Sequence, residues 1–149
     1  MRVCLGGTFS YIHKGHRELI KKAFDKAGLQ GFVFIGLTSD EMIKNKKYLD
    51  YNKRENKLKN FLKKHYPRYK YQVEKINDEY GPAIHADFDC IVVSPETLKN
   101  AEKINEIRSK NNLSKIEIIQ ISYILADDGK PISSTRIHQK QIDKEGKIQ

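Results

Sequence analysis

The sequence has few of the residues that mark several classes of protein. Its 149 residues include no tryptophan, two cysteines, two methionines and four prolines. The cysteines, Cys4 and Cys90, lie in separate apolar segments, which excludes a cysteine-rich zinc site and favours two reduced core residues. The longest apolar runs, such as residues 32–35, are far shorter than the roughly 20 residues of a membrane-spanning helix. The amino-terminal residues have no signal-peptide pattern, so we expect a cytoplasmic protein with no membrane partner.

The charge is strongly unbalanced toward the basic side. Lysine and arginine number 28 against 19 acidic residues, a formal net charge of +9. Phosphate-rich ligands, nucleic acid and a lysine-rich solvated surface all fit this excess. Many lysines fall on the polar faces of expected helices, and the basic and aromatic segment 66–71 fits a helix end that runs into a strand. We therefore predict no nucleic-acid partner, and charge alone does not decide the function.

Short apolar segments alternate with segments of helical period. The sequence predicts strands at 2–5, 32–37, 71–76, 89–93 and 116–121, and helices at 15–27, 51–65 and from the Ser94 cap to about 110, with Ser133 capping a closing helix. This order predicts a single α/β domain over residues 1–149, Rossmann-like and doubly wound, with a mostly parallel five-stranded sheet. The segment 71–76 is the more polar one, which favours a place near the sheet edge. Ligands of such sheets bind at the carboxyl ends of the strands.

The segment after the first strand carries the strongest chemical signal. It reads Gly-Gly-Thr-Phe-Ser-Tyr-Ile-His-Lys-Gly-His over residues 6–16, and neither a Walker A loop nor a Gly-x-Gly-x-x-Gly loop occurs. The glycines let the backbone turn sharply and approach a ligand. His13 and His16 are three residues apart, so both face one side of the first helical turn, where the helix N-terminus attracts phosphate. We therefore interpret this loop as a phosphate-binding site.

A second segment, Pro-Ile-Ser-Ser-Thr-Arg-Ile over residues 131–137, places three hydroxyls and an arginine at a helix start. These side chains can cap the helix, and they can also bind a polyphosphate. With the loop at 6–16, the segment resembles the nucleotidylyltransferase superfamily, and within it the archaeal phosphopantetheine adenylyltransferases. The resemblance is carried further by segments at 38–42, 76–83, 92–97 and 125–132, and it spans nearly the whole chain. One departure is Ser10, where many members have aspartate.

The resemblance implies a reaction in which AMP passes from ATP to 4′-phosphopantetheine, with Mg²⁺ carried by the ATP and no metal bound by the protein itself. The residues implied to bind ATP are Gly7, Thr8, Phe9, His13, Gly15, His16, Ser94, Tyr123, Ser133, Ser134, Thr135 and Arg136. The residues implied in catalysis are His13, His16, Lys47 and Arg136, and those implied to bind the acceptor are Thr8, Lys47 and Tyr80. Lys44 and Lys46 compete with Lys47 for the lysine role, and we favour Lys47. For Arg108 we expect a solvent-exposed or ion-paired role.

Two alternatives remain open at this point. The same loops serve transferases with other acceptors, such as nicotinamide mononucleotide, FMN, glycerol 3-phosphate or phosphocholine. The fold also suits a non-catalytic module that binds a nucleotide or RNA, which the net charge of +9 suggests. The sequence predicts no oligomeric state.

Overall fold

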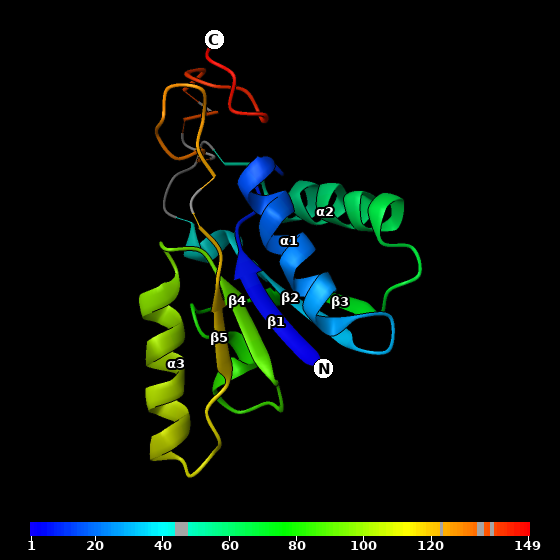
Figure 1. Ribbon diagram of the computed structural model, residues 1–149, viewed down its shortest axis with the longest axis vertical. Coiled ribbons are helices and arrows are strands. Elements are labelled where there is room, and N and C mark those ends of the chain that lie inside the picture. The colour runs from blue at the N-terminus through cyan, green and yellow to red at the C-terminus, as the bar shows by residue number, and fades with distance from the viewer. Residues whose placement is uncertain (44–47, 123, 134–135, 138) are drawn as a thin grey trace.

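The computed structural model describes residues 1–43, 48–122, 124–133, 136–137 and 139–149 (Figure 1). Among these described residues, five strands and three α-helices follow the predicted alternation, with two short 3₁₀ helices between them. The strands are β1 (Arg2–Gly7), β2 (Phe32–Thr38), β3 (Tyr71–Ile76), β4 (Cys90–Val93) and β5 (Glu117–Gln120). The helices are α1 (Lys14–Ala27), η1 (Asp40–Met42), α2 (Tyr51–His65), η2 (Gly81–Ile84) and α3 (Leu98–Lys110).

The strands form one parallel sheet in the order β3-β2-β1-β4-β5. The chain winds outward from β1 to β3 and then returns to the other side of β1 to form β4 and β5. This confirms the predicted Rossmann-like α/β fold, and the more polar β3 is at an edge as expected. The reversal falls between β1 and β4, so the loops that follow these two strands flank the expected ligand site.

Helices cover both faces of the sheet (Figure 1). α1 and α2 pack on one face, where α1 buries the predicted stripe of Leu19, Ile20, Ala23, Phe24 and Ala27. α3 and η2 pack on the other face, against Cys4, Phe34 and Ile91 of the sheet. Gly28 ends α1 with a positive φ of +71°, which glycine adopts readily, and its amide donates to the Phe24 carbonyl as the predicted cap.

The helix predicted to begin after Ser94 begins later. Residues 94–97 instead form a turn, in which the Thr97 amide donates to the Ser94 carbonyl at 3.1 Å. The Thr97 hydroxyl accepts from the Ser94 amide, also at 3.1 Å, which closes the turn around Pro95 and Glu96. Thr97 therefore precedes the helix, and α3 starts at Leu98.

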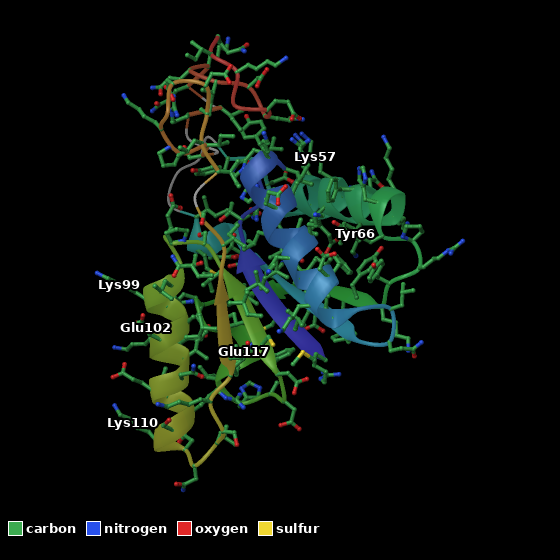
Figure 2. All side chains as sticks on the ribbon, viewed as in Figure 1. Lys57, Tyr66, Lys99, Glu102, Lys110 and Glu117 are labelled. Carbon is green, nitrogen blue, oxygen red and sulfur yellow. The ribbon has the colours of Figure 1, made fainter. Side chains whose placement is uncertain are left out.

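Both cysteines are buried and free. Burial raises the pKa of the Cys4 thiol to about 12 and that of Cys90 to about 11, so both remain protonated at neutral pH. The prediction of reduced core residues is therefore confirmed. The expected solvated charge is also present, since Figure 2 shows Lys99, Glu102 and Lys110 pointing away from the sheet on the outer side of α3. In the part of the chain that the structure describes, no helix is long and apolar enough to cross a membrane.

The carboxy-terminal residues form a small unit beside the first turn of α1 (Figure 1). Ile142 is buried against Ala126 and Ile132, and the predicted turn at 127–129 is closed by the Gly129 amide and the Ala126 carbonyl. Two contacts attach this unit to α1. The Lys14 amide donates to the Lys144 carbonyl at 2.9 Å, and Arg17 pairs with Glu145 at 2.6 Å.

Candidate active site

The turn after β1 is shaped by the packing of an aromatic ring beneath it. Phe9 has φ +47° and is fully buried, and a Cβ on Gly7 would lie 2.9 Å from its ring. Glycine is therefore needed at position 7 for steric reasons. Phe9, which the resemblance implied in ATP binding, lies beneath the turn with its ring 4.8 Å from that of His16. Ser10 is also buried, and its hydroxyl accepts from the Leu49 amide at 3.2 Å.

His13 and His16 form a stacked pair at the start of α1. Their ring centroids are 3.7 Å apart and the planes differ by 14°. His13 caps the helix, because its Nδ1 accepts from the His16 amide at 3.2 Å. A Cβ on Gly15 would lie 2.9 Å from the His13 ring, so glycine at this position leaves room for the stack.

The two rings are held in opposite tautomers. The Nδ1 of His13 accepts a hydrogen bond, so its hydrogen is on Nε2. The Nδ1 of His16 lies 2.7 Å from the Tyr11 carbonyl, which can only accept, so this nitrogen donates and Nε2 has the lone pair. Burial lowers the pKa of His13 to about 3 and that of His16 to about 4, so both are neutral at pH 7. His13 can therefore donate directly to a phosphate, whereas His16 can donate from Nε2 only after it has taken up a proton.

The histidines border a cavity of about 490 Å³ at the carboxyl end of the sheet. The walls come from the β1–α1 turn, the turn after β4 and the segment that follows β5. The predicted ATP residues that line it are Gly7, Thr8, His13, Gly15, His16, Ser94 and Ser133. The Ser133 hydroxyl accepts from the Arg136 amide at 3.2 Å, as a helix cap would, but residues 134, 135 and 138 of the predicted closing helix lie outside the described residues. The structure thus brings together residues from both ends of the chain.

Arg136 is not among the residues that line this cavity. Its guanidinium pairs with Asp128 and donates to the Pro131 carbonyl at 3.1 Å and to Gln141 at 3.1 Å. The Arg136 hydrogen bond lowers the pKa of the Asp128 carboxyl below its usual range. Four other predicted residues lie outside the described residues: Lys47, Tyr123, Ser134 and Thr135.

A second cavity of about 250 Å³ adjoins the first and shares Gly6, Gly7, Thr8 and Thr97 with it. Its lining is mainly apolar and extends from the end of the sheet to η2 and α3. Tyr80, the predicted acceptor residue, lines this second cavity. Thr8 therefore lies where the first cavity, which contains the histidines and several hydroxyl groups, meets the mainly apolar second cavity.

Two buried arginines support these walls, and neither role was predicted. Arg108 is 4% exposed and donates to the carbonyls of Ser114, Ala83 and Ala86 at 2.7 to 2.9 Å. The expectation of a solvent-exposed or ion-paired Arg108 is therefore wrong, because its guanidinium supplies donors to the buried end of η2. Arg54 is fully buried and joins α2 to the ends of β1 and β2. Both arginines lie on the apolar stripes of their helices, and that periodic signal could have revealed them.

Comparison with known proteins identifies the family. Residues 4–140 match the family described as cytidylyltransferase-like. The phosphopantetheine adenylyltransferase of Methanosarcina mazei is 50% identical over 99% of this chain and 96% of its own length. The protein of that name from Archaeoglobus fulgidus is 39% identical over 99% of both chains.

The chain belongs to the phosphopantetheine adenylyltransferase family. This confirms the resemblance drawn from the segments at 6–16 and 131–137. A crystal structure of a protein from Archaeoglobus fulgidus, described as having unknown function, shares the fold. It superposes with a TM-score of 0.73 at 36% identity and covers 81% of this chain and 89% of its own.

Proposed function

We propose that this protein transfers AMP from Mg²⁺-ATP to 4′-phosphopantetheine, giving dephospho-coenzyme A and pyrophosphate, and that it acts in the cytoplasm. The observation that carries this proposal is the position of Thr8 at the junction of two cavities of different chemistry. The cavity with the stacked histidines suits a triphosphate. The apolar cavity suits the arm of an acceptor whose phosphate would reach Thr8.

On the ATP side, His13 would donate to the phosphates from the first turn of α1, and His16 would contact the α-phosphate after its Nε2 has taken up a proton. The dipole of α1 adds a partial positive charge at the same end. Ser94 and Ser133 would contact the nucleotide from the facing walls of the cavity. By family motif we assign Lys47, Tyr123, Ser134 and Thr135 to the same ligand. Arg136 would hold the leaving pyrophosphate after exchanging its Asp128 partner for phosphate oxygens.

The reaction needs alignment and charge neutralisation more than proton transfer. A phosphate oxygen of the acceptor attacks the α-phosphorus, the bond to the β-phosphate oxygen breaks, and pyrophosphate leaves. The attacking phosphate is already ionised near pH 7, so no general base is required. Among the described residues there is no group of three potential metal-ligating side chains, and Glu96 is the only carboxylate among those that line the first cavity. This donor set fits an Mg²⁺ ion that arrives with ATP as part of the substrate.

On the acceptor side, the pantetheine arm would lie along the second cavity between the sheet and η2. Phe34, Ile76 and Phe88 supply apolar surface there. Tyr80 and Asn100 add polar groups that could meet the amides of the arm. Smaller acceptors, such as glycerol 3-phosphate, would leave this apolar surface unused.

The test is pyrophosphate release from Mg²⁺-ATP with a panel of acceptors. The panel contains 4′-phosphopantetheine, nicotinamide mononucleotide, FMN and glycerol 3-phosphate, and CTP replaces ATP as the alternative donor. We expect pyrophosphate release only when ATP is the donor and 4′-phosphopantetheine is the acceptor. Release with another acceptor would overturn the substrate assignment, and nucleotide binding without turnover on any acceptor would favour the non-catalytic module.

A variant at His16 then tests the site itself. His16→Ala should lower kcat by about 10²–10³, as loss of one transition-state contact does, while the KM for ATP changes little. His65→Ala, at the exposed end of α2, is the matched control and should keep wild-type turnover. Turnover of His16→Ala near that of the wild type would remove His16 from the mechanism.

A further inference from the structure

Arg54 is buried at a point where four backbone segments meet. Its Nε donates to the Leu49 carbonyl at 2.8 Å. One terminal nitrogen donates to the carbonyls of Thr8 at 3.1 Å and Thr38 at 2.8 Å, and the other to the Asp40 carboxylate at 3.0 Å. The guanidinium is fully buried, whereas the Asp40 side chain is 54% exposed. The ends of β1 and β2 are therefore joined through one buried cation.

Arg54 also contacts a short chain of hydroxyl groups. The nitrogen that donates to the Thr38 carbonyl lies 3.3 Å from the Thr38 hydroxyl oxygen. That oxygen is in turn 3.0 Å from the hydroxyl oxygen of Thr8. A guanidinium can only donate, so the Thr38 oxygen accepts from Arg54 and turns its own hydrogen away from the positive charge, toward Thr8. The Thr8 oxygen accepts this hydrogen, which leaves the Thr8 hydrogen to be donated elsewhere.

We propose that Arg54 is a positioning residue for the transfer reaction: acting through Thr38, it orients the Thr8 hydroxyl so that Thr8 donates its hydrogen to the acceptor phosphate. The inference rests on the proposed function, in which Thr8 meets that phosphate. An anion binds a hydroxyl only through its hydrogen, so a Thr8 hydroxyl turned toward Thr38 would present an oxygen lone pair to the phosphate. The direction of these hydrogen bonds is set by Arg54, a residue of α2 that lines neither cavity.

The discriminating variant is Thr38→Val. It removes the Thr38 hydroxyl, which lies between Arg54 and Thr8, and keeps the shape of the side chain. Arg54 retains its carbonyl and carboxylate partners in this variant, so folding is preserved. We expect kcat/KM for phosphopantetheine to fall about tenfold, the size of a lost hydrogen bond to a charged group, while the KM for ATP stays within twofold. Thr38→Ser restores a hydroxyl at this position and should return most of the activity.

A double-mutant cycle separates this role from a general loosening of the loop. Thr8→Val alone should also reduce kcat/KM for the acceptor. In the Thr8→Val background, Thr38→Val should then have almost no further effect, because no hydroxyl remains for it to orient. Thermal unfolding of each variant shows that the fold is intact.

The outcomes are distinguishable. The orienting role is overturned if Thr38→Val lowers kcat/KM for phosphopantetheine by the same factor with and without the Thr8 hydroxyl, or if it has no effect in either background. The proposed function stands in both cases. Failure of the wild-type protein to turn over phosphopantetheine would instead overturn the proposed function. A loss that Thr38→Ser does not recover would also count against the hydroxyl chain.

Discussion

Acid should destabilise this protein through the buried His13 and the half-buried His16. In an unfolded chain, the pKa of histidine is about 6.5. In the folded protein, burial lowers the pKa of His13 to about 3 and that of His16 to about 4. Between these values the unfolded state binds more protons than the folded state. The stability is therefore complete above about pH 6.5 and is lost as the pH falls toward the folded-state values.

The size of this effect follows from the linkage relation. His13 is 7% exposed, so solvent screening of its environment is small. With pKa values of about 3 folded and about 6.5 unfolded, its contribution to the free energy of unfolding falls by about 2 kcal/mol between pH 7 and pH 5. His16 contributes a similar loss, so the pair together accounts for about 4 kcal/mol. That is a large part of the stability of a domain of this size.

The measurement is urea-induced unfolding of the wild type and one variant at pH 7.5, 6 and 5. In His13→Asn, an amide oxygen can still accept from the His16 amide and cap the helix, but the titrating group is gone. Its loss of stability between pH 7.5 and pH 5 should be smaller than that of the wild type by about 2 kcal/mol. If the free energy of unfolding fell equally between pH 7.5 and pH 5 for His13→Asn and the wild type, the reasoning would be refuted.

Three further predictions concern the walls of the site. Gly15→Ala would place a Cβ 2.9 Å from the His13 ring, and the displaced ring should raise the KM for ATP by roughly five- to tenfold in steady-state kinetics. Arg108→Met would remove three hydrogen bonds and leave the buried Ala83 carbonyl unpaired, so thermal or urea unfolding should show a loss of about 1–3 kcal/mol, and the KM for the acceptor should rise more than that for ATP. Asp128→Asn removes the charged partner of Arg136, and calorimetry should show pyrophosphate binding a few-fold more tightly.

The fold was largely predictable because its local signals agree with one another. The stripe of α1 and the cap at Gly28 predicted that helix within one residue of its observed limits. The polarity of residues 71–76 predicted an edge strand, and β3 is at the edge. The start of α3 was missed because Ser-Pro-Glu is also a favourable turn sequence. In that turn the Thr97 hydroxyl accepts from the Ser94 amide, whereas the prediction had the Ser94 side chain cap the helix.

The candidate site was predictable where its residues are contiguous in the sequence. Gly7, Thr8, His13, Gly15 and His16 belong to one motif, and the structure brings them to one cavity. The tautomers of the histidines were not predictable, because they depend on which atoms the ring nitrogens face. The Tyr11 carbonyl that determines the tautomer of His16 is a main-chain group, and no pattern of side chains in the sequence predicts its position.

The two missed arginines share a physical task, which is to supply hydrogen-bond donors to main-chain carbonyls outside the sheet. In a parallel sheet whose ligands bind at the carboxyl ends of the strands, the chain passes there from strand to loop. The carbonyls of these loops then have no hydrogen-bond partner on a neighbouring strand. Arg54 supplies donors to the carbonyls of Thr8 and Thr38 at that end of the sheet, and Arg108 supplies them to the carbonyls of Ala83 and Ala86 in the crossover between β3 and β4. A guanidinium suits this role because it carries five donors and accepts none. An irregular loop can thus be held rigidly enough for chemistry by a helix side chain that never touches the substrate.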